Sequence, residues 1–407
     1  MKTITQKAET ARMETKRLRL PSWLLTLLPL LALAVLLWAF IQVDPLRSLT
    51  GVLPPIEKLT MERIDLRPEG MIVHVINGGP EPVTLAQVQV DDAYWPFEVQ
   101  PVSEIPRLGR ATLMIPYPWV EGEAHTVRLV TSTGLTFDKT VDVAVETPYP
   151  DLTFWLMFAL LGFYVGIVPV SLGLMWFPLL KRLSRQGLSF ILALTVGLLV
   201  FLFVDTVLEG IEIAQQIPDV FQAVPLVFFA SMLSFLALVA IGSSRRVADS
   251  STGSGRLWLA TMIALGIGLH NLGEGMAIGA AVALGQAALG AFLVLGFTLH
   301  NITEGIGIGA PMTRDKPSLP QLVGLAVLAG GPAIVGTWVG GFSYSPLFAV
   351  LFLAIGAGAI LQVVYEVTRL IMAQGTHSAR AAASWVNVAG LAAGIAIMYL
   401  TAFLVKF

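Results

Sequence analysis

The sequence predicts a polytopic α-helical membrane protein with an anchor helix, a small β-sandwich domain and a bundle of further helices, in that order. Of its 407 residues, 55% are hydrophobic and 13% are charged, a far more apolar mixture than ordinary globular proteins have. Apolar runs long enough to cross a bilayer lie before and after residues 43–150, whose composition is mixed. These two observations argue against an ordinary soluble protein.

The N-terminal end, residues 1–20, is basic and predicts a cytoplasmic start. Its charged residues are Lys2, Lys7, Arg12, Lys16, Arg17 and Arg19, against Glu9 and Glu14. Residues 22–42 follow as an apolar run long enough to span a bilayer. A secretory signal would have similar flanks, but no small-residue cleavage site follows before Pro45, so we expect an uncleaved anchor. The chain has no Cys, which excludes disulfides and thiolate metal sites.

Residues 43–150 are expected to form a β-sandwich-like domain outside the cytoplasm. Short runs of alternating apolar residues between turn residues are typical of strands. They lie at 71–76, 83–90, 111–115 and 127–143. Such a succession of short strands resembles immunoglobulin-like folds in pattern. His74 and His125 lie here without a clustered partner, so we interpret them as ordinary strand residues, with metal binding as the alternative.

Residues 151–407 predict a bundle of eight membrane-spanning helices. The apolar segments are 152–177, 188–213, 222–242, 257–283, 287–311, 320–341, 346–373 and 383–405. Basic residues concentrate in the connections at every second crossing, which places those connections in the cytoplasm. The anchor then runs outward, so the β-domain and the C-terminus are extracytoplasmic. We expect an integral protein of a prokaryotic inner (plasma) membrane, in contact with its lipid.

One polar motif occurs twice within these apolar segments. L-H-N-L-G-E-G-M-A-I-G-A runs from Leu269 to Ala280, and L-H-N-I-T-E-G-I-G-I-G-A runs from Leu299 to Ala310. In each copy the His and the Glu are four residues apart, so both face one side of a helix. The polar residues are His270, Asn271 and Glu274 in the first copy and His300, Asn301 and Glu304 in the second.

The two motif helices are expected to place both histidines at equal depth near the middle of the membrane. Gly285 is the midpoint between His270 and His300, in a turn-like stretch, and each His is about 22 Å of helix away from it. Because the helices are antiparallel, the two glutamates lie on opposite sides of the histidines. We therefore predict two imidazoles stacked between two carboxylates along the membrane normal.

Such a set of side chains favours a metal site. Ionisable groups at this depth are costly unless they pair or bind an ion, so a functional site is the default interpretation. Imidazoles and carboxylates suit a borderline divalent ion such as Zn, Fe or Mn, and the two Asn side chains can add oxygen ligands. The alternative is a pair of His–Glu hydrogen bonds that joins the helices. Duplication of the whole set favours metal.

At these residues the sequence resembles the ZIP family of divalent metal transporters, whose fourth and fifth helices carry H-N-x-P-E-G and a related H-[EN]-x-P-x-E pattern. The resemblance covers the eight segments after residue 150, and not the anchor or the β-domain. It implies an eight-helix ZIP-like transporter bundle with both ends outside, import of Zn, Fe or Mn, and a homodimer.

The resemblance also implies roles for the motif residues. His270, Glu274, His300 and Glu304 would form the primary metal site, and Asn271 and Asn301 would contribute to a second site that shares both glutamates. This sequence departs from the family pattern at three positions. Gly331 precedes Pro332 where the family has a Glu, which implies a weak or absent second site. Gly273 and Thr303 replace the two motif prolines, which puts the family's local helix unwinding in doubt.

Two further groups of polar residues are candidates for a cation pathway. Asp205, Glu209 and Glu212 are spaced as one acidic stripe at the predicted outer end of their helix, where they would concentrate cations. For Glu212, a position at the membrane surface explains its charge equally well. Glu366, four residues after Gln362, resembles an acidic position of the family and is a candidate exit ligand.

Two alternatives to transport remain at this point. A membrane-embedded zinc hydrolase would use the metal to activate water. A metal sensor that no longer transports would explain Gly331 and the missing prolines, and the β-domain would recruit its unknown partner. We favour the transporter, which is not an enzyme, takes the divalent metal as its substrate and needs no organic cofactor or nucleic acid.

Overall fold

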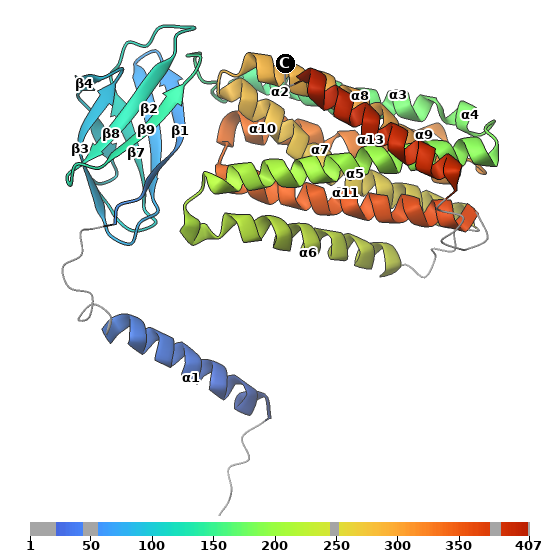
Figure 1. Ribbon diagram of the computed structural model, residues 1–407, viewed down its shortest axis with the longest axis horizontal. Helices are drawn as coiled ribbons and strands as arrows, with labels where there is room; N and C mark the ends of the chain where they lie inside the picture. Colours follow the sequence, from blue (N-terminus) through green and yellow to red (C-terminus); the bar gives the residue numbers. More distant parts are fainter. Residues whose placement is uncertain (1–21, 44–55, 245–251, 375–383, 406–407) are drawn as a thin grey trace, which may run out of the picture. The chain divides into compact units, whose positions relative to one another are not determined.

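The computed structural model describes residues 22–43, 56–244, 252–374 and 384–405 (Figure 1). The chain divides into two units, residues 1–55 and residues 56–407. The first unit contains helix α1 (Ser22–Val43), which confirms that the predicted anchor is helical. Helix α1 has 22 residues, enough to cross a bilayer, and its anchoring role stays a prediction. The basic residues 1–20 lie outside the described residues.

The second unit begins with a β-domain made of two antiparallel sheets. Its described strands are β1 (Leu59–Arg67), β2 (Gly70–Asn77), β3 (Val83–Val90), β4 (Ala93–Trp95), β5 (Glu98–Gln100), β6 (Glu104–Ile105), β7 (Arg110–Ile115), β8 (His125–Thr131) and β9 (Thr136–Val141). One sheet has the order β1-β2-β7-β5, and the other β4-β3-β8-β9 with β6 paired to β3. Buried residues of both sheets, such as Val73 and Val88, share one core, as in a sandwich. The predicted strands are therefore confirmed, while β1, β4, β5 and β6 were not predicted.

A bundle of helices follows the β-domain. Its described helices are α2 (Leu152–Gly162), η1 (Phe163–Ile167), α3 (Val168–Met175), α4 (Phe177–Leu180), α5 (Arg185–Gln215), η2 (Asp219–Phe221), α6 (Ala223–Ser244), α7 (Gly253–Ala283), α8 (Ala287–Gly309), η3 (Ala310–Met312), α9 (Leu319–Gly330), α10 (Pro332–Ser343), α11 (Pro346–Gln374) and α13 (Trp385–Val405). The two copies of the polar motif lie on α7 and α8, which are neighbours in the bundle.

Seven described segments are helical, long and apolar enough to cross a membrane, which indicates an integral membrane protein. They are Leu152–Leu180, Arg185–Gln215, Asp219–Ser243, Leu289–Met312, Leu319–Ser343, Pro346–Met372 and Trp385–Phe403. Helix α7 is 31 residues long but is not among them. Its polar motif lowers its mean hydropathy. Seven of the eight predicted segments therefore have the length and composition of membrane spans, and the number of eight spans stays a prediction.

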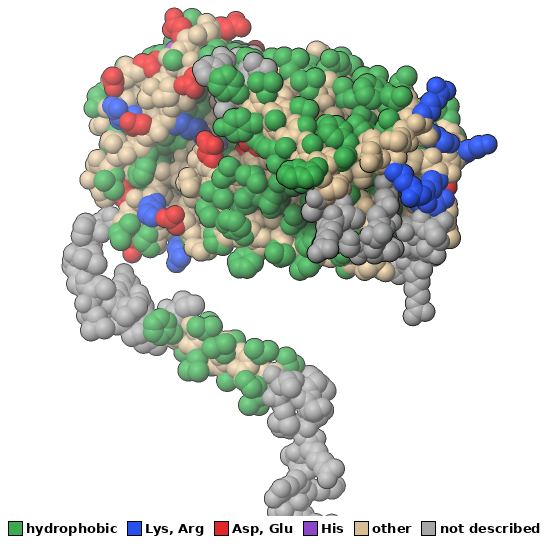
Figure 2. Space-filling model, turned by 45° about the vertical axis from the view of Figure 1, so that its right-hand side comes forward, with side chains coloured by type: hydrophobic (Ala, Val, Ile, Leu, Met, Phe, Trp, Pro, Cys, Tyr) green, Lys and Arg blue, Asp and Glu red, His purple; other side chains and the backbone are tan. Residues whose placement is uncertain are grey.

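The surface of the bundle has the character expected of helices in lipid. Hydrophobic side chains cover most of its visible face, while Lys and Arg gather at one end (Figure 2). Large apolar residues such as Phe228, Phe229 and Leu233 of α6 are exposed. In contrast, α7 lies inside the bundle, where it packs against α8, α9, α10 and α11. The polar motif is thus shielded from lipid by neighbouring helices.

Two helices near the motif are irregular, whereas the motif helices are not. Residues 163–167 form a turn of π-helix between α2 and α3. Helix α9 ends at Gly330 and α10 begins at Pro332, which has no N–H to donate. Both α7 and α8 continue unbroken through Gly273 and Thr303. The Thr303 hydroxyl donates to the His300 carbonyl at 2.6 Å. The unwinding that the ZIP resemblance implies for the motif helices is therefore absent from this conformation.

Candidate metal site

The structure brings the six motif residues together between α7 and α8. All six are buried, and none is more than 5% exposed. They are His270, Asn271, Glu274, His300, Asn301 and Glu304. Each motif forms one polar stripe on its helix. Because the six residues come together, the stripes of α7 and α8 face each other.

Glu274 joins the two histidines. Its Oε1 lies 3.0 Å from His270 Nε2, on the same helix, and 2.6 Å from His300 Nε2, on the neighbouring one. A carboxylate oxygen only accepts hydrogen bonds, so both imidazoles donate to it. Its other oxygen, Oε2, accepts from Asn301 Nδ2 at 3.3 Å. His270 and Glu274 thus face one side of α7, as predicted, and the bond from His300 is one interhelical His–Glu bond of the kind that the alternative interpretation expected.

The two imidazoles do not form the predicted stack. Their ring centroids are 6.4 Å apart and their planes are inclined by 39°. The physical reason is that both rings turn their Nε2 atoms toward the single oxygen of Glu274, which a parallel stack would not allow. Phe297 also packs edge-on against the His300 ring, with centroids 5.7 Å apart, and helps to fix its tilt.

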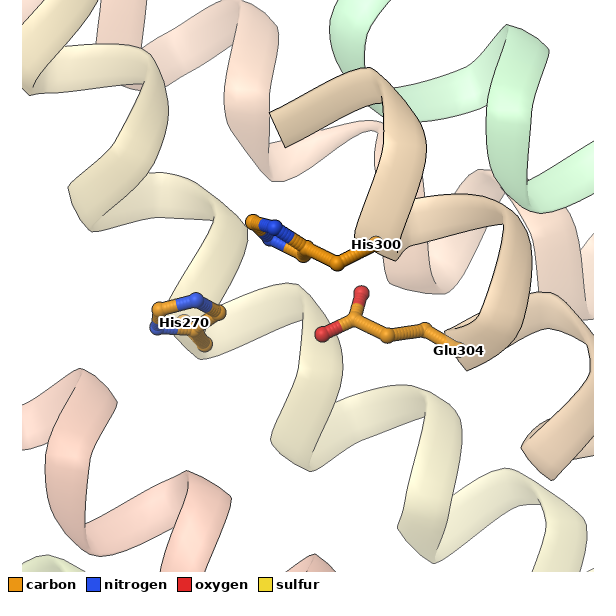
Figure 3. A group of neighbouring side chains, drawn as sticks. All are labelled: His270, His300 and Glu304. Carbon is orange, nitrogen blue, oxygen red and sulfur yellow. The ribbon is translucent and has the colours of Figure 1, made fainter. Parts of the chain in front are cut away.

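Glu304 completes a group that can hold a metal ion. Three potential ligand atoms lie within 4.8 Å of one another, one each from His270, His300 and Glu304. Figure 3 shows the Glu304 carboxylate directed toward the two imidazoles, which come from different helices. Neither of its oxygens has a partner in good hydrogen-bond geometry among the described residues. A buried carboxylate is costly unless it is paired, so this group is ready to bind a cation.

The two motif asparagines connect the site to the irregular helices. Asn301 Nδ2 donates to the carbonyl of Val165, within the π-turn, at 3.0 Å. Asn271 Nδ2 donates to the carbonyl of Ala329, just before the break between α9 and α10, also at 3.0 Å. These bonds fix the orientation of both amides. Sequence reasoning assigned the asparagines as ligands only, and the carbonyls they bind carried no sequence signal.

The amide oxygens of the two asparagines remain available. Asn271 Oδ1 and Asn301 Oδ1 are buried and accept no hydrogen bond from the described residues. Together with two imidazoles and two carboxylates, they supply the nitrogen and oxygen donors that Zn, Fe and Mn bind. The donor set therefore fits a divalent transition-metal ion, and one interhelical His–Glu hydrogen bond, between His300 and Glu274, exists beside it.

The acidic residues of α5 lie near this site but are not part of its hydrogen-bonded core. Asp205 and Glu212 are exposed, and Glu209 is partly buried. Glu209 is within electrostatic range of Glu274, and Asp205 is within range of His300. The predicted stripe thus adds negative potential next to the cluster.

The two candidates on α11 are buried. Gln362 is fully buried and Glu366 nearly so, and Arg369 Nη1 lies 3.7 Å from Glu366 Oε2. Gly331, where the resemblance to the ZIP family would place a carboxylate, forms the junction between α9 and α10. Gly331 offers no side-chain ligand, as predicted from the sequence.

The histidines of the β-domain each bind a carboxylate in the same domain. His74 Nε2 lies 3.1 Å from Asp65, and His125 Nδ1 lies 2.7 Å from Asp91. Burial by itself would raise the pKa of Asp65, but the His74 hydrogen bond and the charge of Arg63 outweigh it and hold the pKa below its usual range. Neither histidine belongs to a metal-binding group of the described residues.

Comparison with known proteins gave no match, either to a family model or to a curated protein.

Proposed function

We propose that the protein transports divalent transition-metal cations, Zn, Fe or Mn, across a membrane, in the inward direction. We further propose that it is a member of the ZIP family with an added anchor and an added extracytoplasmic β-domain. The six motif residues bind the cation in the middle of the bundle. Asp205, Glu209 and Glu212 attract it, and Glu366 receives it at the opposite end of the pathway.

One observation carries this proposal. Two copies of one motif, on neighbouring helices, converge on a buried cluster in which Glu304 and both asparagines keep acceptor oxygens without a hydrogen-bond partner among the described residues. A purely structural His–Glu link would need only Glu274, which already accepts from both histidines. The unused acceptors are what a positive ion would bind.

Uptake of metal by liposomes tests the proposal. The purified full-length protein is reconstituted, and uptake of Zn, Mn and Fe(II) is compared between wild type and the double variant His270→Ala/Glu304→Ala. We expect the wild type to take up these metals selectively. Uptake by the variant should be at least about tenfold slower, because losing a ligand that contributes about 1.4 kcal/mol of binding free energy weakens binding tenfold.

The control is Glu121→Gln, a charge removal on the exposed surface of the β-domain, which should leave uptake unchanged. Tight metal binding without uptake by the wild type would overturn transport and favour the sensor or the hydrolase. Cleavage of an added lipid or peptide would then distinguish those two.

A further inference from the structure

Gln362 of α11 is a buried amide next to the motif helix. It is fully buried, and neither its Nε2 nor its Oε1 has a partner in good hydrogen-bond geometry among the described residues. Glu366, one turn further along, can accept a hydrogen bond from the amide nitrogen, which leaves the amide oxygen without a partner in the described part of the chain. Leaving the oxygen of a buried amide unsatisfied costs free energy, so the position calls for a ligand that this oxygen binds.

Contacts between α7 and α11 place Gln362 one turn away from the metal site. A Cβ atom on Gly356 would lie 3.6 Å from His270 Nδ1, and one on Gly266 would lie 2.8 Å from Gln362 Oε1. The two helices are therefore antiparallel: α7 runs from Gly266 to His270 beside the stretch of α11 that runs from Gly356 to Gln362. Gly266 is four residues before His270, which is about 6 Å along the helix.

The same direction leads to a cavity at the end of the bundle where α7 begins and α11 ends. The cavity has a volume of about 360 Å³ and is lined by Gly242, Trp258, Met262, Tyr365, Glu366 and Arg369, among others. Met262 is one turn beyond Gly266 on α7, and Glu366 is one turn beyond Gln362 on α11. Polar side chains thus succeed one another from His270 through Gln362 to Glu366 and the cavity.

We propose that Gln362 is a relay ligand, whose amide oxygen binds the cation after it leaves the histidines and before it reaches Glu366. This inference rests on the proposed transport function and adds a selectivity step to it. An amide oxygen is a neutral, hard ligand, which suits Mn²⁺ better than the softer Zn²⁺. A neutral ligand between two carboxylate-containing sites also holds a cation weakly enough for it to move on, as conduction requires.

The test compares Mn and Zn uptake by full-length protein in liposomes for wild type, Gln362→Leu and Gln362→His. Leu keeps the approximate size of Gln362 without an amide, so Mn uptake should fall about tenfold, the effect of about 1.4 kcal/mol on a barrier. Equilibrium binding of Mn, measured on the same purified protein, should stay within about twofold because the six motif residues are intact. His should shift the ratio of Mn to Zn uptake toward Zn, since imidazole suits Zn.

The matched control is Asn387→Leu, which removes another buried amide, on α13, and should behave as wild type. The relay is overturned if the wild type takes up metal and both Gln362 variants take it up at the same rate. In that outcome the ratio of Mn to Zn uptake is also unchanged in both variants. Absence of uptake by the wild type overturns the transport function itself. If Gln362→Leu does not fold, the metal ratio of Gln362→His decides the question, because a structural role alone would not change that ratio.

Discussion

Glu274 and Glu304 occupy equivalent positions in the two motif copies but have different partners. Glu274 accepts from both histidines, whereas Glu304 lies beside them without a hydrogen-bond partner among the described residues. The four-residue spacing was sufficient to predict that His270 and Glu274 lie on one face of α7. It could not predict which carboxylate bridges the helices, because that depends on how α7 and α8 are rotated against each other by their neighbours.

At this scale we predict that the two glutamates contribute differently to metal binding. Glu274→Gln removes a charge and replaces one carboxylate oxygen by an NH2 donor, so the histidines keep only a neutral amide oxygen as their shared acceptor and Asn301 loses its bond to the other oxygen. Titration of the purified protein with Zn or Mn should show an affinity at least about tenfold lower for Glu274→Gln. Glu304→Gln removes the charge alone and should weaken binding less. If both variants bind the metal with the same affinity as the wild type, neither carboxylate is a metal ligand.

At the scale of helices, glycine contacts set the position of the site. Gly305 of α8 lies directly against Gly173 and the Val170 carbonyl of α3, and Gly275 of α7 lies against the Ala333 carbonyl of α10. A side chain at any of these places would push the helices apart. The sequence predicts the helices from their apolar length, but it does not say which helix faces which glycine. That is why the π-turn and its bond to Asn301 were not predicted.

We expect Gly305→Ala to disturb both stability and metal binding. Its Cβ would collide with the Val170 carbonyl, so α8 must move and carry His300 and Glu304 with it. Such overpacking costs about 1–3 kcal/mol, measurable by equilibrium unfolding in mixed micelles. The matched control is Gly324→Ala on α9, where a Cβ meets nothing within 4 Å and Ala favours the helix. Equal stability of the two variants would contradict the packing argument.

At the scale of the whole molecule, composition predicted the order of a helical segment, a β-domain and a helical bundle, and the structure confirms that order. The predicted strands were found because strand periodicity is local. Among the strands that were not predicted, β4 to β6 have only two or three residues each and are defined by their partners, whereas β1 has nine. Helix α7 shows a different limit: the polar residues of its motif lower its mean hydropathy, so the feature that we propose as a metal site also weakens the signal of α7 as a span.

The central claim is that the doubled motif binds a divalent metal through both of its histidines. X-ray absorption at the Zn K-edge, on purified protein loaded with one equivalent of Zn, tests it most directly. We predict two imidazoles and oxygen ligands around the metal, and loss of the imidazole signal in His270→Ala/His300→Ala but not in His377→Ala, which alters a histidine outside both motifs. The claim is contradicted if the zinc has no imidazole ligand, or if its ligands are the same in the double variant as in the wild type.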